Sequence, residues 1–300
     1  MSKSRKTWLI IATFFVVIGG VIFMALMQSV KWDFSKLSTV KYETNSYEIQ
    51  EEYKNISIVT DTSDVEFVIS ENAKSTVVCY EQTKITHLVS VKEHTLTIEI
   101  QDTRKWYEHI GISFGSPKIT VCLPKGEYGE LSVRCDTGDI SVDEQFEFES
   151  IDILGSTGDV INRASASEDI RLKTSTGRIC VENVSANNIH LAISTGDVIL
   201  KNVTCQSVVS KGSTGNILLE GVIAKESISV ERNTGNVKFE GSDAADILVK
   251  TSTGDVKGTL LSEKVYIVET STGDIKVPKS TKGGTCEITT STGDIKISVQ

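Results

Sequence analysis

The sequence predicts an all-β protein: a single-stranded parallel β-helix (β-solenoid) of about nine 19–20-residue coils, preceded by an irregular β cap and one N-terminal transmembrane helix. Three observations lead to this prediction. A motif related to S-T-G-D recurs nine times from residue 136, apolar and polar residues alternate around each copy, and one long uncharged run lies near the N-terminus. The composition agrees, since 22 Gly against 3 Pro favours many short strands joined by glycine turns.

The first predicted element is a transmembrane helix over residues 7–27, which follows a short cytoplasmic tail, residues 1–6. These 21 residues carry no charge, and at about 1.5 Å per residue they span a hydrocarbon core of about 30 Å. A cleaved signal peptide would have an apolar core of about 7–15 residues and a small-x-small cleavage site. This run is longer, and Ala25-Leu26-Met27 is a poor cleavage site, so an uncleaved helix is expected. Because Lys3, Arg5 and Lys6 precede the run, we expect a single-pass cell-membrane protein with a cytoplasmic N-terminus and an extracytoplasmic C-terminal domain.

A polar tether, residues 28–45, is expected to lead into an irregular β region, residues 46–130. Residues 56–68 of this region read as a degenerate coil, with Ser63 where a glycine would lie. Further strands are expected at residues 77–80, 87–91, 95–100 and 118–123. An uncovered first coil would invite pairing with other chains, so this region is predicted to be the N-terminal cap.

The repeat itself fills residues 131–300. Its glycines recur every 19 or 20 residues, a period typical of solenoids. They are Gly138, Gly158, Gly177, Gly196, Gly215, Gly235, Gly254, Gly273 and Gly293. Apolar residues cluster seven and five positions before each glycine and two and four after it, which predicts strands with one buried face. A meander with each motif as a hairpin turn is the alternative, but Thr-Gly is not a favoured two-residue hairpin loop.

The nine glycines are predicted to be structural turn residues that need a positive φ. The residue after each glycine is Asp or Asn in eight copies and Arg178 in the other. Such a column could hold Ca²⁺, but it lacks the nonapeptide spacing of calcium-binding β-rolls. We therefore interpret these residues as turn formers and predict no metal ligands and no cofactor.

The charge distribution and the absence of known motifs exclude several classes of protein. Outside residues 1–27 the chain has 28 Lys and Arg against 40 Asp and Glu, a net charge of −12, which argues against binding nucleic acid. No G-x-S-x-G, H-E-x-x-H, P-loop or dinucleotide motif occurs, so no catalytic residue is predicted and the protein is expected not to be an enzyme. A polysaccharide-active β-helix enzyme is a less favoured alternative, since such sites need long inserted loops and the repeat spacing is constant.

The histidines and cysteines do not indicate a metal-binding or catalytic site in the sequence. His87, His94 and His190 are expected to be core or surface residues without a ligand partner. The six cysteines form no C-x-x-C pair. Cys180, Cys205 and Cys286 lie at different places in their repeats, so these three are predicted to be free thiols.

Two surfaces are candidates for contacts with partners. The stretch from residue 102 to 117 is rich in aromatic residues, and exposed aromatics among polar neighbours bind sugars or proteins. Its aromatic residues Trp106, Tyr107, His109 and Phe114 are expected to pack as a lid over the end of the solenoid, and the alternative is that they are partner-binding residues. The last coil, residues 294–299, is expected to have an uncovered edge that supports weak end-to-end self-association.

The S-T-G-D coils, the N-terminal anchor and the strand from Lys118 to Pro124 together resemble the bacterial putative-adhesin family of membrane-anchored β-strand-repeat proteins, a family of unknown function. The resemblance covers about residues 40–300. It implies a parallel β-helix located in the cell envelope. Two roles follow: an adhesion or binding module without catalysis that contacts a cell-wall polymer or an envelope protein, or an accessory sensor of an envelope-stress system.

Overall fold

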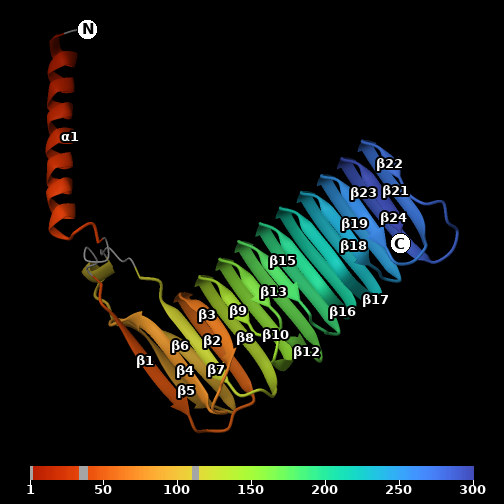
Figure 1. The fold of residues 1–300 in the computed structure, drawn as a ribbon, viewed down its shortest axis with the longest axis horizontal. Coiled ribbons are helices and arrows are strands. Elements are labelled where there is room, and N and C mark those ends of the chain that lie inside the picture. The colour runs from red at the N-terminus through yellow and green to blue at the C-terminus, as the bar shows by residue number, and fades with distance from the viewer. Residues whose placement is uncertain (1–2, 34–39, 110–114) are drawn as a thin grey trace.

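The computed structural model describes residues 3–33, 40–109 and 115–300, and shows a long helix followed by an extended β-solenoid (Figure 1). Helix α1 (Lys3–Ser29) contains the stretch Arg5–Ser29, whose mean hydropathy of 2.8 and length of 25 residues suffice to cross a membrane. All strands of the described part of the chain belong to one hydrogen-bonded sheet that coils along the rod. The predicted all-β solenoid with one N-terminal apolar helix is confirmed.

Each coil places one strand before its corner and one after it, and equivalent strands of neighbouring coils pair in parallel. The strands before the corners are β2 (Asn55–Thr62), β8 (Glu127–Thr137), β10 (Glu147–Thr157), β13 (Asp169–Thr176), β15 (Asn188–Thr195), β19 (Asp246–Thr253), β21 (Lys264–Thr272) and β23 (Gly284–Thr292). Those after the corners are β3 (Asp64–Ile69), β9 (Ile140–Val142), β11 (Val160–Asn162), β14 (Ile179–Glu182), β18 (Val237–Ser242), β20 (Val256–Leu260), β22 (Ile275–Lys276) and β24 (Ile295–Val299). The long strands β16 (Val198–Thr214) and β17 (Ile217–Thr234) run from one corner to the next, and β12 (Ser165–Ala166) adds a short third side. This parallel pairing rules out the meander.

The core is a set of columns that run along the rod. Seven positions before successive glycines, the paired residues are Leu131, Ile151, Ile170, Ile189, Val208, Ile228, Ile247 and Cys286. All of them are buried. Burying one aliphatic side chain of this kind contributes about 1.5–3 kcal/mol. A slip of one residue in any coil would turn its apolar face outward, so the alternation sets the register.

At the N-terminal end, β2 and β3 form the first coil but not the first layer. Strands β6 (Thr95–Asp102) and β7 (Lys118–Leu123) pair in parallel with β2 and β3 on their outer side. Strands β5 (Ile85–Lys92), β4 (Ser75–Gln82) and β1 (Tyr42–Ile49) then add antiparallel pairings, and η2 (Trp106–His109) is a single 3₁₀ turn. Strand β1 begins within residues 28–45, so the predicted tether is shorter than expected.

At the C-terminal end, the chain changes the order of its coils. Strand β23 pairs with β19 on one side and β21 on the other, and β24 likewise lies between β20 and β22 (Figure 1). The expectation that residues 294–299 form an uncovered edge is therefore wrong. Ile295 pairs with Val256 on one side and Ile275 on the other and is buried, whereas Ile275 of the outer coil remains 44% exposed. Ile297 pairs with Gly258 of β20 and is also buried. Among the described residues, the uncovered edge belongs to β21 and β22.

The cysteines of the solenoid are small core residues. Cys180, Cys205 and Cys286 are free thiols, as predicted. Burial raises the pKa of Cys180 and Cys205 to about 11 and that of Cys286 to about 12. Protonated, enclosed thiols of this kind are poor nucleophiles, so they contribute packing rather than chemistry.

Candidate functional site

Both the backbone conformation and the close contact between coils require glycine at the corners. All nine have φ between +129° and +152°, a region that is populated almost only by glycine. A Cβ added to any of them would lie 1.6–2.4 Å from a carbonyl oxygen of the adjacent coil. The corners therefore stack as tightly as backbone allows, and no ligand can enter this column.

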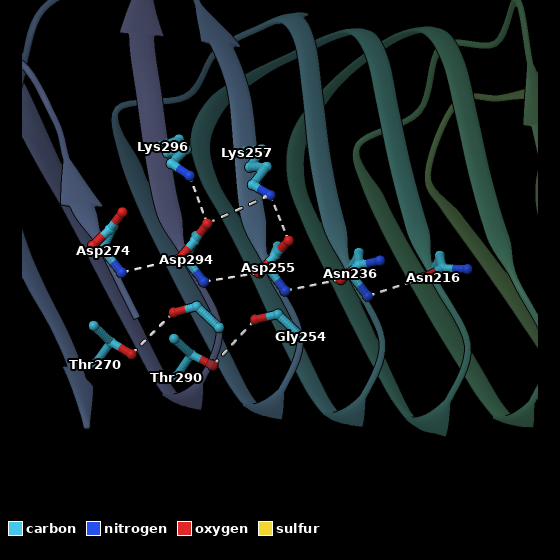
Figure 2. Close-up of polar contacts among 11 residues, drawn as sticks. Asn216, Asn236, Gly254, Asp255, Lys257, Thr270, Asp274, Thr290, Asp294 and Lys296 are labelled. Carbon is cyan, nitrogen blue, oxygen red and sulfur yellow. Dashed lines mark hydrogen bonds and ion pairs between the residues drawn. The ribbon is translucent and has the colours of Figure 1, made fainter. Parts of the chain in front are cut away.

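The Asp and Asn residues that follow the glycines form a hydrogen-bonded ladder (Figure 2). The backbone N–H of Asp255 donates to Asn236 Oδ1 at 2.8 Å, that of Asp294 to Asp255 Oδ1 at 2.8 Å, and that of Asp274 to Asp294 Oδ1 at 3.0 Å. Lys296 donates to Asp294 Oδ2 at 2.5 Å. The backbone N–H of Asp274 and the Lys296 ammonium together hold the pKa of the Asp294 carboxyl below its usual range. These side chains serve as turn and stacking groups, because their acceptor oxygens bind the next coil.

One corner of the stack, between β6 and β7, is interrupted by a longer segment, and we call it the open corner. Thr95 to Glu99 of β6 pair with residues 55–59 of β2, and Lys118 of β7 pairs with Asp64 of β3. Between β6 and β7, where other layers have only one or two residues between the strands of the corner, the chain has residues 103–117. The constant repeat spacing correctly predicted no insertion within residues 131–300, but it did not show that β6 and β7 are themselves a layer of the stack.

A cavity of about 310 Å³ lies beside this open corner. Its lining comes from the first regular corner, the inserted residues, the β4–β5 hairpin and two neighbouring strands: Asp61, Thr62, Ser63, Arg104, Gly115, Pro117, Gln82, Ile85, His87, Tyr42 and Ile100. The Arg104 guanidinium is oriented by Asp102, with Nη2 2.6 Å from Oδ2 and Nε 2.9 Å from Oδ1. The cavity thus presents acid, base, amide and aromatic groups, and its volume is at the small end of ligand pockets.

The first of the aromatic candidates, Trp106, lies two residues after the cavity-lining Arg104. Trp106 begins η2 and is 82% exposed, which contradicts a lid role for this residue. Tyr107 and His109 follow in the same turn, whereas Phe114 lies outside the described residues. An ion pair between Lys84 and Glu108 joins the turn to the β4–β5 hairpin and, as the largest cause, lowers the pKa of Glu108. The structure therefore places three of the four predicted residues in one turn.

Behind the cavity is a buried polar network that the sequence analysis missed. Glu81 of β4 is fully buried, and its Oε2 lies 2.7 Å from both the backbone N and Nδ1 of His87 on β5. Asn45 Nδ2 donates to Glu81 Oε1 at 2.8 Å, and Thr60 Oγ1 lies 3.0 Å from His87 Nε2. Cys79 is adjacent on the same face of β4, and burial followed by the Glu81 charge raises its pKa to about 12.

His87 is a buried residue, one of the two positions expected for it, and its ring is paired with Glu81. The available signal was the C-x-E alternation of Cys79 and Glu81, followed after a short turn by His87, which a β-hairpin brings to the same face. The chain Thr60–His87–Glu81 also has the hydrogen-bond order of a hydrolase triad. However, Thr60 is buried and does not line the cavity, so its hydroxyl is not presented to a substrate there.

A second, wider groove of about 630 Å³ follows the side of the solenoid between Lys54 and Ser185. Glutamates dominate its lining, and the exposed Lys54 pairs with Glu149 at 2.8 Å. Solvated charges of this kind contribute little binding energy. The cap cavity is the better candidate site because an aromatic ring, an amide and charged groups of both signs line it.

The comparison with protein families agrees with the fold. The sequence matches the family described as Toastrack DUF4097 over residues 53–231 and 207–300. No curated protein matches it significantly. Two solved structures are similar: a "putative adhesin" from Bacteroides fragilis at 18% identity, covering 86% of this chain and 97% of that one with a TM-score of 0.48, and a "putative lipid binding protein" from Parabacteroides distasonis at 15% identity, covering 87% and 98% with a TM-score of 0.44.

Proposed function

Because this chain belongs to the Toastrack DUF4097 family, we propose that it is a membrane-anchored binding module of the bacterial cell envelope that acts without catalysis. Helix α1 serves as the anchor, with residues 1–6 in the cytoplasm and the cap and solenoid outside. The length and hydropathy of α1 and the basic residues before its apolar run support this topology. The solenoid acts as a rigid spacer, since its corners are closed by glycine stacking.

The observation that carries this proposal is the open corner of the cap. Arg104, Asp61 and Gln82 line the cavity, and Trp106, two residues after Arg104 in the chain, is 82% exposed. An exposed indole beside hydrogen-bonding groups can stack on the apolar face of a sugar ring while the polar groups contact its hydroxyls. We therefore assign a cell-wall polymer, contacted through its sugar units, as the ligand class.

The test is binding of the purified full chain, in detergent, to isolated bacterial cell walls. Trp106→Ala should weaken binding about 10-fold or more, since truncating an aromatic anchor costs about 2 kcal/mol at a binding hot spot. The control is Ile223→Ala, which truncates an exposed apolar side chain on the solenoid side, 37% exposed. Equal binding by the two variants, or no binding to walls by the unmodified chain, would contradict the proposal.

An accessory sensor of an envelope-stress system is the second candidate. It is favoured by Gly19 and Gly20 of α1, where an added Cβ would meet nothing within 4 Å, so another membrane helix could approach closely. In that case cross-linking in intact membranes should capture a membrane protein through α1. Substituting both glycines by Leu would then abolish the cross-link, whereas wall binding would be unchanged.

A further inference from the structure

Three side chains of different chemistry converge in the cap below the cavity. The Cys79 sulfur, a Glu81 carboxylate oxygen and a His87 ring nitrogen all lie within 4.8 Å of one another. Cys79 and Glu81 are fully buried, and His87 is 4% exposed. Sulfur, imidazole nitrogen and carboxylate oxygen are the donors that zinc takes in proteins. We propose that Cys79, Glu81 and His87 are the protein ligands of one Zn²⁺ ion.

The charge balance of the site supports a divalent cation. A carboxylate is rarely fully buried unless it is paired or binds a metal. Among the residues that the structure describes, Glu81 forms an ion pair with His87 and with no Lys or Arg. One Zn²⁺ with the Glu81 carboxylate, the Cys79 thiolate and a neutral His87 ring has a net charge of zero. The Cys79 thiol loses its proton to solvent when the ion binds.

The surrounding hydrogen bonds orient these ligands as an outer shell does in zinc sites. His87 Nδ1 faces Glu81 Oε2 at 2.7 Å, so a metal at Nδ1 would replace the proton there, and Nε2–H would then donate to Thr60 Oγ1 at 3.0 Å. Asn45 Nδ2 already holds the other carboxylate oxygen at 2.8 Å. Two tetrahedral ligands at about 2.0–2.1 Å from zinc lie about 3.3 Å apart, so Nδ1 and Oε2, now 2.7 Å apart, need to separate by about 0.6 Å.

The position of His87 provides access to the site. His87 lines the cavity of about 310 Å³, so an ion can enter from there and a water can take the fourth coordination position. The donor set excludes Ca²⁺ and Mg²⁺, which need six or more oxygen ligands or retained water. The site therefore differs from a calcium site on the Asp column, and it joins β4 to β5 directly below the proposed ligand cavity.

The experiment measures metal binding by the full chain in detergent after removal of metal with EDTA. We expect one equivalent of Zn²⁺ per chain, and Co²⁺ in its place should give a thiolate-to-cobalt charge-transfer absorption. Cys79→Ser should abolish that absorption and weaken Zn²⁺ binding about 100-fold or more, and Thr60→Val should weaken it about 10-fold while all three ligands remain. Cys122→Ser is the matched control, because this half-buried thiol on β7 is outside the site, and it should bind like the unmodified chain.

Three results would overturn the zinc site: less than one equivalent of Zn²⁺ bound by the unmodified chain, the same affinity in Cys79→Ser and Cys122→Ser, or a cobalt absorption that survives Cys79→Ser. Thr60→Val keeps the test decisive if Cys79→Ser does not fold. Trp106→Ala should leave zinc binding unchanged. Failure of the wall-binding proposal and failure of the zinc site are therefore separate outcomes.

Discussion

Replacing Gly235 by Ala tests whether the corner column holds the solenoid together. Gly235 has φ of +148°, and an added Cβ would lie 2.0 Å from the Gly215 carbonyl oxygen. Backbone strain in this region costs about 1–3 kcal/mol. The contact also forces the two coils apart by about 1 Å or more, which disturbs bonds such as Gly215 N–H to Thr234 O at 2.9 Å, each contributing about 0.5–1.5 kcal/mol. We expect Gly235→Ala to lower the free energy of unfolding by about 3–6 kcal/mol, which is among the largest effects of single substitutions.

Two other glycines provide graded controls for this substitution. At Gly155 the backbone φ is ordinary and an added Cβ would first meet Thr174 Oγ1 at 3.5 Å, so Ala should change stability by less than about 1 kcal/mol. Gly241 has φ of +59° but its nearest neighbour would be Gln300 Oε1 at 3.5 Å, so Ala should cost about 1–2 kcal/mol from conformation alone.

The assay is urea unfolding of the full chain in detergent, followed by far-ultraviolet circular dichroism. Midpoints should fall in the order Gly155→Ala, Gly241→Ala, Gly235→Ala, with slopes compared because repeat arrays can lose cooperativity. If Gly235→Ala unfolds at the same midpoint as Gly155→Ala, the close stacking of the corners does not stabilise the solenoid. If it matches Gly241→Ala, conformation matters and the contact between coils does not.

Four further outcomes are expected. Protease added to intact protoplasts should remove the solenoid while a cytoplasmic marker survives, and protection of the solenoid would show the opposite topology. Arg232 is 2% exposed, its Nε and Nη1 have no hydrogen-bond partner among the described residues, and burial lowers its pKa to about 10. Because the charged form of Arg232 is disfavoured in the fold, Arg232→Met should raise the free energy of unfolding by about 1–4 kcal/mol at pH 7. This advantage should shrink as the pH rises from about 10 toward 12.5, because the folded unmodified chain then loses the buried charge. An unchanged urea midpoint in Arg232→Met would refute this. Sedimentation should show weak self-association through the uncovered edge of β21 that Ile267→Lys weakens, whereas concentration-independent monomers of the unmodified chain would contradict an exposed pairing edge. Millimolar Ca²⁺ should leave the melting temperature unchanged, since the Asp oxygens bind backbone N–H groups, and a rise with Ca²⁺ but not Mg²⁺ would reverse this assignment.

The sequence by itself determined the local geometry of the coils. A glycine every 19 or 20 residues, with apolar residues at constant offsets, is sufficient to specify the corner, the two strands and their buried faces. The degenerate coil with Ser63 at its corner was also correctly predicted, since β2 and β3 pair with β8 and β9. These features depend on residues close in sequence, and the same pattern recurs in every coil of the repeat.

Only the tertiary structure decided the order of the layers and the convergence of distant side chains. Every coil presents the same apolar pattern to its neighbours, so the pattern permits any coil to stack on any other, and the insertion of β23 between β19 and β21 is invisible in it. The space beside Gly212 that the Arg232 guanidinium fills is likewise a contact between coils. The open corner and the meeting of Cys79, Glu81 and His87 depend on the pairing of β6 with β2 and on the hairpin of β4 and β5. Such long-range pairings are set by total burial and hydrogen bonding across the cap, and they cannot be predicted from the periodicity of nearby residues.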